Sequence, residues 1–260
     1  MRRGLSKAKH AFSRLSFGAV GHPAKDGPTN SASSQTVWED NLDDEVGFWN
    51  RYLSTSGLEW PDEFQMRLDP SSVVTDDLVG RHLRWLASTD VSILDVGAGP
   101  LTIINKTFPG KTLAITATDP LADDYDRLLT EARIDPPVRT VRCEGERLLT
   151  MFEPDTFDIA FARNALDHSY EPIRVIRNMI ELVKAGGFIL LKHRRNEAQT
   201  VGYEGLHRWN FDIDDGDLIV WNPDTRHSVW TSFGHCVDVD VRYDSEWINC
   251  ALTKTSSERL

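Results

Sequence analysis

Residues 92–102 read SILDVGAGPLT, an apolar run that ends in Asp95 and opens into a turn containing Gly97 and Gly99. A short apolar run closed by glycine is typical of a buried strand followed by a tight turn. Because glycine has no Cβ, each glycine lets the backbone approach a ligand closely. The segment therefore predicts a ligand-binding turn at the end of a buried strand.

The chain after this turn alternates between short apolar runs and helical patterns. Strands are predicted at 91–96, 113–118, 138–143, 157–162 and 188–192, and helices at 101–106, 122–132, 144–151 and 172–183. Buried strands separated by helices are typical of an α/β fold, a doubly wound parallel sheet with helices on both faces. In such a sheet the turn after the first strand faces the binding crevice.

The regions on either side of this alternation have other patterns. Residues 37–88 contain two helical patterns around an irregular Pro-rich segment, 59–70, and are interpreted as an N-terminal helical cap. Residues 208–222 alternate around Asp215-Gly216, which predicts a hairpin, and two further strands are predicted in CVDVDVRYD and WINCALTK. We expect residues 89–260 to form one domain with a β-rich C-terminal edge.

The composition excludes several classes of function. The 260 residues are 40% hydrophobic, enough for a substantial core, and carry a formal charge of −11, which argues against a nucleic-acid partner. There is no run of about 18 apolar residues, so no membrane-spanning helix is predicted. Three unevenly spaced cysteines form no disulfide framework, which favours a cytoplasmic location.

The N-terminal segment differs in charge from the rest of the chain. Residues 1–36 contain six basic residues and one acid. Because Gly, Pro and Ser follow the basic stretch, we interpret the segment as a disordered, solvated tail. A weak contact with an anionic membrane surface or a transit sequence is the alternative.

Two acids lie where predicted strands end. Asp95 ends the first strand, where it can fix the turn or meet a cationic group. Asp119 ends the second strand about twenty residues after Gly97, where a carboxylate can accept both hydroxyls of a ribose. A dinucleotide-binding turn needs a third glycine where Thr102 stands, and Pro100 follows the second glycine directly. The pattern therefore indicates an adenosine-type ligand without a required diphosphate.

These blocks, in this order, resemble the class I S-adenosylmethionine-dependent methyltransferases over about residues 90–195. LDVGAGP is similar to their first motif, TATDP to the second strand with its ribose acid, and CEGERL to the segment after the third strand. FDIAFARNALDHSYEPIRVIRNMIELVKAGGFILL resembles the fourth strand, its loop and helix, and the fifth strand. The resemblance implies a Rossmann-like methyltransferase sheet and S-adenosylmethionine as the cofactor.

The resemblance also implies roles for single residues. Asp119 would bind the ribose, Leu121 would stack on adenine, Glu144 would take its exocyclic amine, and the Gly145 backbone would meet a ring nitrogen. The glycine turn would hold the methionine part of the cofactor, with Asn164 near the same end. The expected cofactor residues are Asp95, Gly97, Gly99, Asp119, Leu121, Glu144, Gly145 and Asn164.

Histidines supply the candidate catalytic groups. Methyl transfer to a hydroxyl needs an aligned acceptor and a base that removes its proton, and imidazole suits that task. His168 follows the fourth predicted strand, and His193 ends the fifth. We expect one of them to act as the base, with Asp167 able to orient His168. Packing in the core or capping a helix is the alternative role for each.

Residues near the fifth strand are candidates for substrate binding. Arg194 and Arg195 suit a carboxylate or phosphate on the substrate, although a salt-bridged strand end is an equal alternative. His207 lies a short connection later, and Trp209 could stack on a sugar or ring, although core packing is favoured for it. No metal is expected, because the acids and histidines have no recognisable ligand spacing.

The predicted function is S-adenosylmethionine-dependent methyl transfer to a small-molecule or glycan acceptor, with a hydroxyl favoured. YEGLHRWNFD and WPDEFQMRLDP are similar to segments of bacterial methyltransferases associated with glycan or exopolysaccharide assembly. A non-catalytic S-adenosylmethionine-binding regulatory or scaffold protein is the alternative. A dinucleotide-dependent oxidoreductase is a weaker one, because Thr102 replaces the third glycine.

Overall fold

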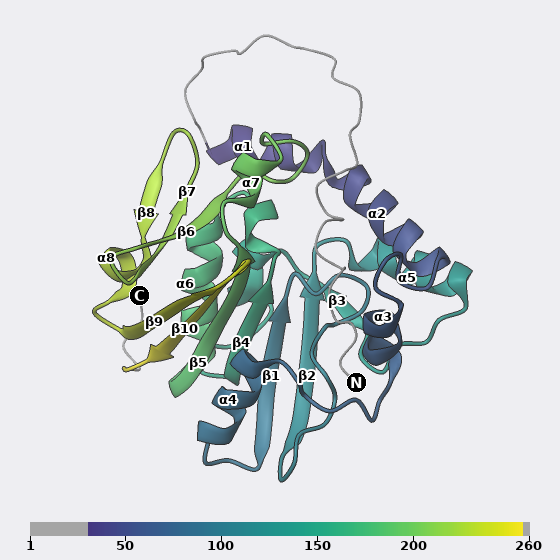
Figure 1. Ribbon diagram of the computed structural model, residues 1–260, viewed down its shortest axis with the longest axis horizontal. Coiled ribbons are helices and arrows are strands. Elements are labelled where there is room, and N and C mark those ends of the chain that lie inside the picture. The colour runs from purple at the N-terminus through teal and green to yellow at the C-terminus, as the bar shows by residue number, and fades with distance from the viewer. Residues whose placement is uncertain (1–30, 257–260) are drawn as a thin grey trace, which may run out of the picture.

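The computed structural model describes residues 31–256, which build one central sheet with helices on both faces (Figure 1). The predictions made for residues 1–30, which include most of the basic tail, lie outside the described residues. Helix α1 (Ser31–Glu39) begins before residue 36, so regular structure starts inside the segment interpreted as the tail. Within residues 31–256, no helix is long and apolar enough to cross a membrane.

The central sheet has seven strands in the order β3-β2-β1-β4-β5-β10-β9. Neighbours from β3 to β5 pair in parallel, whereas β10 pairs antiparallel with both β5 and β9. The predicted doubly wound sheet and its β-rich edge are therefore confirmed. The strands are β1 (Asp90–Val96), β2 (Thr112–Asp119), β3 (Thr140–Arg142), β4 (Phe157–Arg163), β5 (Val183–Arg194), β9 (Val237–Asp244) and β10 (Trp247–Lys254).

Alternating side chains divide the sheet into two buried faces. One face packs against α6 (Pro172–Leu182) and includes Ile189, whereas the other packs against α4 (Asp77–Trp85) and includes Leu190. These two residues are neighbours on β5, and side chains of neighbouring residues in a strand point to opposite faces. The alternation of side chains along a strand therefore decides whether each residue packs on the α6 side or on the α4 side, up to the carboxyl end of the strand.

Three helices form a further core beside the carboxyl ends of β1 and β2. They are α2 (Leu42–Ser54), α3 (Pro61–Leu68) and α5 (Ala122–Ala132), seen together on one side of Figure 1. The prediction that 59–70 is irregular is wrong, because it contains α3. Pro61 stands at the first position of that helix, where its missing N–H costs no hydrogen bond. Phe64 is buried in the same core, so packing supports the short helix.

The connection from β1 to β2 is irregular backbone, so the predicted helix at 101–106 is wrong. The Thr102 hydroxyl donates to the Asp95 carboxylate at 2.5 Å, and the backbone N–H of Lys106 donates to the Ser72 carbonyl at 2.9 Å. Hydrogen bonds to distant groups thus replace those of a helical turn. The two β-branched isoleucines in the segment also disfavour a helix.

A second, three-stranded sheet lies beside α6 and consists of β6 (Asn210–Asp214), β7 (Asp217–Trp221) and β8 (Arg226–Ser228). Asp215 and Gly216 both have positive φ and turn the chain between β6 and β7, so the predicted hairpin is confirmed. Phe211 joins the core on the α6 side. The remaining short helices are η1 (Gly145–Thr150), η2 (Leu166–His168), α7 (Glu197–Thr200) and α8 (Val229–Phe233).

Candidate active site

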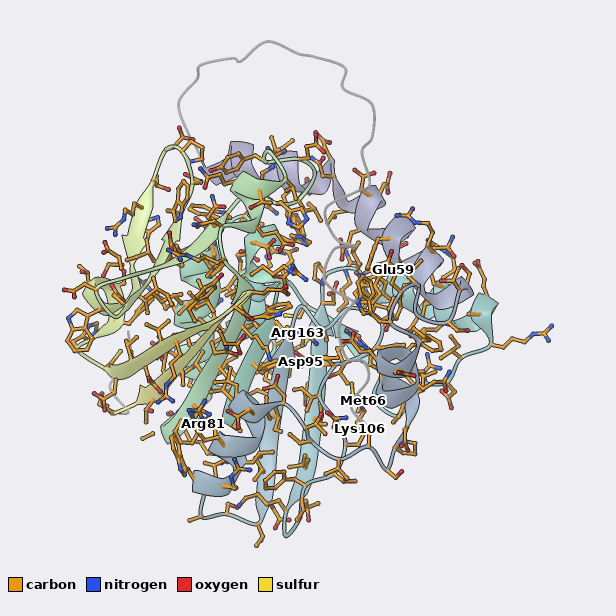
Figure 2. The ribbon with its side chains drawn as sticks, in the orientation of Figure 1. Glu59, Met66, Arg81, Asp95, Lys106 and Arg163 are labelled. Carbon is orange, nitrogen blue, oxygen red and sulfur yellow. The ribbon has the colours of Figure 1, made fainter. Side chains whose placement is uncertain are left out.

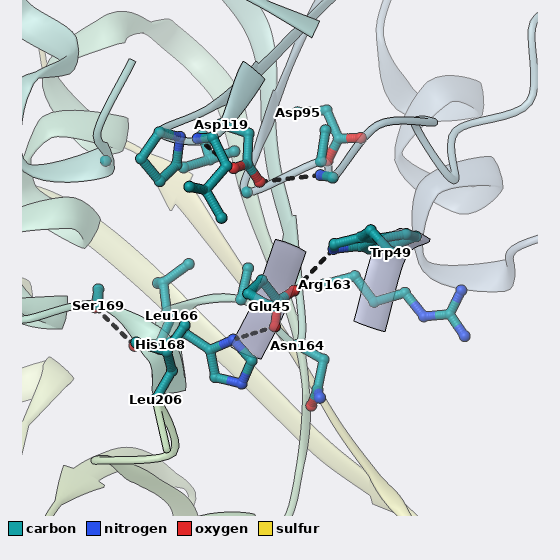
Figure 3. Close-up of a pocket in the computed structure, with 18 of the residues that line it drawn as sticks. Glu45, Trp49, Asp95, Asp119, Arg163, Asn164, Leu166, His168, Ser169 and Leu206 are labelled. Atoms are coloured by element: carbon teal, nitrogen blue, oxygen red, sulfur yellow. Dashed lines mark hydrogen bonds and ion pairs between the residues drawn. The ribbon is translucent and has the colours of Figure 1, made fainter. Parts of the chain in front are cut away.

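A cavity of about 260 Å³ lies at the carboxyl ends of the parallel strands, between the sheet and α2 (Figure 3). Figure 2 shows Asp95 and Arg163 close together at the ends of the paired strands β1 and β4. Seven of the eight expected cofactor residues line the cavity: Asp95, Gly97, Gly99, Asp119, Leu121, Gly145 and Asn164. The structure therefore gathers the expected cofactor residues around one space.

Both glycines of the turn after β1 are required by conformation and by space. Gly97 has φ of 70° and Gly99 has φ of 64°, in the left-handed region that glycine occupies without strain. A Cβ on Gly97 would lie 2.4 Å from the Ala165 Cβ, and one on Gly99 would lie 2.5 Å from the Trp49 ring. The turn is thus covered by the segment after β4 on one side and by α2 on the other.

Asp119 lies buried where β2 ends. Its carboxylate accepts hydrogen bonds from the backbone N–H of Gly99 at 3.1 Å and of Leu121 at 3.0 Å. Burial raises the pKa of Asp119 to about 7, although these two bonds oppose the shift. Burial likewise raises the pKa of Asp95 to about 6 against the opposing bond from Thr102. Ribose hydroxyls that donate to Asp119 would stabilise its ionised form, so the residue suits that ligand.

Glu144 is the expected cofactor residue that does not line the cavity. Its carboxylate accepts a hydrogen bond from the Tyr170 hydroxyl at 2.9 Å. The adjacent Gly145 and Glu146 line the cavity instead. Val175 packs against Gly145, and the apolar side chains of Leu121 and Leu166 also line the cavity. A bare glycine turn, a buried acid and an apolar wall together fit the amino-acid, ribose and adenine parts of S-adenosylmethionine.

Asn164 follows β4 in a left-handed conformation, with φ of 48°. Its side-chain amide donates to Glu197 at 2.7 Å, and its side-chain oxygen accepts from the backbone N–H of Arg194 at 3.1 Å. These bonds tie the turn after β4 to the end of β5. They hold Asn164 in the cavity wall.

Helix α2 covers the cavity with aromatic side chains. The Trp49 indole donates to Glu45 at 2.8 Å, and the Glu45 carboxylate lies 3.9 Å from Nδ1 of His168. Phe48 and Tyr52 from the same helix also line the cavity. The sequence predicted this helix but not its place over the site. The available signal in the sequence is the cluster of aromatic residues Phe48, Trp49 and Tyr52.

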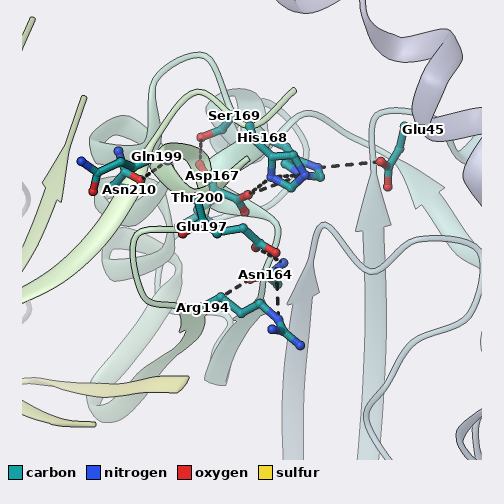
Figure 4. Close-up of polar contacts among 12 residues, drawn as sticks. Glu45, Asn164, Asp167, His168, Ser169, Arg194, Glu197, Gln199, Thr200 and Asn210 are labelled. Carbon is teal, nitrogen blue, oxygen red and sulfur yellow. Dashed lines mark hydrogen bonds and ion pairs between the residues drawn. The ribbon is translucent and has the colours of Figure 1, made fainter. Parts of the chain in front are cut away.

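Asp167, His168 and His207 form an acid–imidazole cluster (Figure 4). Nδ1 of His207 lies 2.8 Å from Oδ2 of Asp167 and 3.1 Å from Nε2 of His168. Nε2 of His168 lies 3.4 Å from the same Asp167 oxygen. His168 lines the cavity, whereas Asp167 and His207 lie behind it. The arrangement allows His168 to take a proton from a group in the cavity.

Electrostatic coupling within the cluster favours this role. Burial opposes ionisation of Asp167, yet the charges of His168 and His207 hold the pKa of its carboxyl well below the usual range. Burial also works against the charged form of His207, but the hydrogen bond to Asp167 and its charge raise the pKa of His207 overall. A negative Asp167 therefore stands ready to stabilise positive charge on the imidazoles.

The same cluster is the group within residues 31–256 whose donor atoms could share a metal ion, since these atoms lie within 4.8 Å of one another. The hydrogen bond between Asp167 and His207 already pairs two of the three donors. His207 stands 39 residues after His168, so sequence spacing gave no sign of the grouping.

Two predicted site residues pack in the core instead of lining the cavity. His193 is 1% exposed, and its ring stacks on Phe211 with 3.9 Å between centroids. Both of its ring nitrogens lack a hydrogen-bond partner, and burial lowers the pKa of His193 to about 4. Trp209 packs against the core on the α6 side. The structure thus separates both residues from the cavity.

Of the two adjacent arginines, Arg194 lines the cavity and Arg195 does not. Arg195 pairs with Asp212 of β6 at 2.6 Å. The wall residues that were not predicted from the sequence include Arg67, Arg163 and Trp247. They come from α3, β4 and β10, and no local motif marks them.

Residues 94–191 match the methyltransferase domain family. No match was found among curated proteins. A 1,6-didemethyltoxoflavin-N1-methyltransferase from Burkholderia thailandensis, solved with 1,6-didemethyltoxoflavin and S-adenosylhomocysteine, is similar at 15% identity over 90% of this chain and 94% of that chain, with a TM-score of 0.45. A SAM-dependent methyltransferase from Methanosarcina mazei is similar at 16% identity over 67% of this chain and 97% of that chain, with a TM-score of 0.41.

The family match spans most of the parallel sheet, from within β1 to within β5. It therefore includes the glycine turn, Asp119 and the segment that carries Asp167 and His168. Over these residues the chain is similar to methyltransferase domains, and the cavity at its strand ends fits S-adenosylmethionine.

Proposed function

We propose that the protein transfers a methyl group to a hydroxyl of a small-molecule or glycan acceptor, with His168 as the general base. The observation that carries the proposal is the position of His168 in the cavity wall, with Asp167 and His207 directly behind it. S-adenosylmethionine supplies a methyl group activated by a positively charged sulfonium. The protein must therefore mainly align the acceptor and remove its proton.

Proton removal falls to His168 and its neighbours. As the acceptor oxygen bonds to the methyl carbon and the carbon–sulfur bond breaks, the hydroxyl proton passes to His168. The imidazolium formed lies 3.4 Å from Asp167 and 3.9 Å from Glu45. Because Asp167 is buried, water screens its attraction only weakly. His207 holds the Asp167 carboxylate through its 2.8 Å hydrogen bond.

The partial cover over the site supports a small acceptor group. Helix α2 covers the cavity, and Trp49 contacts the turn that carries Gly99. A cover of this kind excludes water from the transfer and strengthens electrostatic interactions inside. It admits a small molecule or one end of a glycan more readily than a folded protein.

The test is the substitution His168→Ala. Single-turnover methyl transfer, measured with labelled cofactor and an acceptor found by extract screening, should fall by roughly 10²–10⁴-fold. Calorimetry should show nearly unchanged affinity for S-adenosylhomocysteine, because His168 serves the acceptor. Near-normal turnover would overturn the assignment of His168 as the base.

His227→Ala is the matched control, since His227 is half-buried on β8 and outside the cavity. It should retain turnover. Asp167→Asn keeps the shape of the side chain while removing its charge, so it should reproduce much of the loss seen in His168→Ala. Melting temperatures of all three variants separate a folding defect from a catalytic one.

A further inference from the structure

Cations gather on one face of the sheet where the cavity meets β4, β5 and β10. Arg163 at the end of β4 pairs in register with Lys192 of β5, and Arg194 of β5 pairs with Trp247 of β10. Lys192 and Arg194 share a face because strand side chains alternate. It is the face to which Leu190 and α4 belong. Three positive side chains therefore meet beyond the end of α4.

Trp247 stands at the centre of this group. The guanidinium carbons of Arg163 and Arg194 each lie 5.1 Å from the centroid of the Trp247 ring, and Nζ of Lys192 lies 5.9 Å from it. These are cation–π distances, so the indole holds the cations in place. Arg163, Arg194 and Trp247 line the cavity, and Figure 4 shows Arg194 beside Asn164.

The carboxylate nearest to Arg163 is shared between two guanidiniums. Glu63 accepts from Arg67 at 2.8 Å and lies 3.5 Å from Arg163. Burial works against ionisation of Glu63, but the two arginines lower its pKa, so it carries one negative charge against two positive ones. Asp95, on which the charges of Arg67 and Arg163 also act, is a second acid on this side of the cavity.

The other two cations also lie near carboxylates. Lys192 pairs with Asp76 at 2.5 Å, so the carboxylate largely compensates the positive charge of Lys192. Arg194 lies 4.0 Å from Glu197, and burial together with the charge of Asp167 raises the pKa of Glu197. In a chain with a formal charge of −11, two guanidiniums in the cavity wall on either side of one indole indicate an anionic ligand.

We propose that Arg163 and Arg194, positioned by Trp247, bind a carboxylate on the methyl acceptor. The proposal rests on the proposed function, since it takes the cavity to hold the acceptor as well as the cofactor. A guanidinium donates charge-assisted hydrogen bonds in a planar fork that matches a carboxylate. The positive side chains around Trp247 would also attract an acceptor carboxylate.

The cofactor has a carboxylate of its own, on its methionine part. The expected binding turn for that part follows β1, whereas Arg194 and Trp247 belong to β5 and β10, two and three strands away in the sheet. With neighbouring strands about 5 Å apart, this corresponds to roughly 10–14 Å. Arg163 on β4 lies only one strand from β1, so the position of Arg194 and Trp247 is what favours the acceptor as the source of the carboxylate.

The test measures equilibrium binding to protein saturated with S-adenosylhomocysteine. The probes are 4-hydroxybenzoate and 4-hydroxybenzamide, which share a shape and differ in charge. Wild type should prefer the acid, and Arg163→Gln and Arg194→Gln should each weaken its binding by about tenfold or more. Arg242→Gln, a strand arginine paired with Asp240 away from the cavity, is the control. Equal binding of acid and amide by wild type would overturn the proposal.

Trp247 is tested as a positioning residue. Trp247→Leu should reduce the preference for the acid, and Trp247→Phe should restore part of it, because an aromatic face still attracts both guanidiniums. A merely structural role predicts a loss of thermal stability without a change in the ratio of acid to amide binding. That result would remove Trp247 from the subsite.

A second arm identifies the source of the carboxylate. Arg194→Gln is titrated with S-adenosylhomocysteine and with 5′-methylthioadenosine, which lacks the amino-acid part. Both affinities should match wild type. Weaker binding of S-adenosylhomocysteine alone would assign the arginine to the cofactor and overturn the proposal. Because no turnover is measured, failure of His168→Ala to slow transfer would refute the base assignment without affecting this result.

Discussion

The two halves of the cavity are built differently. The half expected to bind the cofactor, the cofactor half, consists of strand ends and the turns next to them, where Gly97, Gly99 and Asp119 stand within a few residues of a buried strand. The half proposed to bind the acceptor, the acceptor half, combines side chains from α2, η2, β5 and β10. Its key pair, His168 and His207, comes from segments 39 residues apart. Local chain geometry thus makes one half, and tertiary packing makes the other.

The largest effect is expected at Gly99, where the two halves of the cavity touch. In Gly99→Ala the new Cβ would meet the Trp49 ring at 2.5 Å, so either the turn or α2 must shift. Overpacking together with a positive φ should lower the free energy of unfolding by about 2–4 kcal/mol. Affinity for S-adenosylhomocysteine should fall as well, measured by calorimetry beside chemical denaturation.

Gly110→Ala is the matched control for this prediction. Gly110 has φ of 75° but no atom within 4 Å of an added Cβ, so it has the backbone cost without the clash. It should lose only about 1 kcal/mol of stability and keep its cofactor affinity. Equal effects of both substitutions would show that Trp49 does not press on the turn.

The next effect concerns Asp119 in the cofactor half. Asp119→Ala should weaken S-adenosylhomocysteine binding by about 1–3 kcal/mol, because two charge-assisted hydrogen bonds to the ribose are lost. Calorimetry gives the difference directly. Asp124→Ala, a substitution in the first turn of α5 outside the cavity, should leave the affinity unchanged. Unchanged affinity in Asp119→Ala would mean that another group holds the ribose.

A smaller effect follows from the pKa of about 7 for Asp119 in the free protein. Ribose hydroxyls donate to the ionised carboxylate, so affinity for S-adenosylhomocysteine should rise from pH 6 to pH 8, by up to about tenfold. Asp119→Asn cannot ionise and should show a flat profile over the same range. A parallel rise in wild type and variant would trace the pH dependence to another group.

The raised pKa of Asp119 also determines whether the free energy of unfolding rises or falls with pH. The folded-state pKa of Asp119 is raised from 3.8, so its contribution to stability is fully present below about pH 4 and is lost as pH rises toward 7. Asp119→Asn should therefore gain stability relative to wild type between pH 4 and pH 8. Denaturation at both pH values measures this difference.

Residues of the cofactor half could be assigned from the sequence more readily than residues of the acceptor half. Asp119 could be assigned from the sequence because the end of a strand and the chain direction fix its position. Arg194 and Arg195 could not be told apart, because one residue of register decides which face each joins. The structure directs Arg194 into the cavity and Arg195 to Asp212. The same alternation buries His193 on Phe211.

The fold shows where local patterns mislead. The prolines in 59–70 predict irregular backbone. Pro61 nevertheless begins α3, because the first position of a helix needs no N–H donor. The helix predicted at 101–106 is missing because the Thr102 hydroxyl bonds to Asp95 and backbone groups bond to Ser72. In both segments, contacts with distant residues decided the structure.

The smallest expected effect is that of a chelator on turnover. The donor atoms of Asp167, His168 and His207 lie within 4.8 Å of one another, but the 2.8 Å hydrogen bond from His207 engages Asp167 without a metal. If the cluster works as a base supported by a carboxylate, dialysis against EDTA should leave methyl transfer unchanged. A loss that Zn²⁺ or Fe²⁺ restores, and that Asp167→Asn makes irreversible, would instead assign a metal ion to this cluster. His168 would then serve as a metal ligand and not as the base.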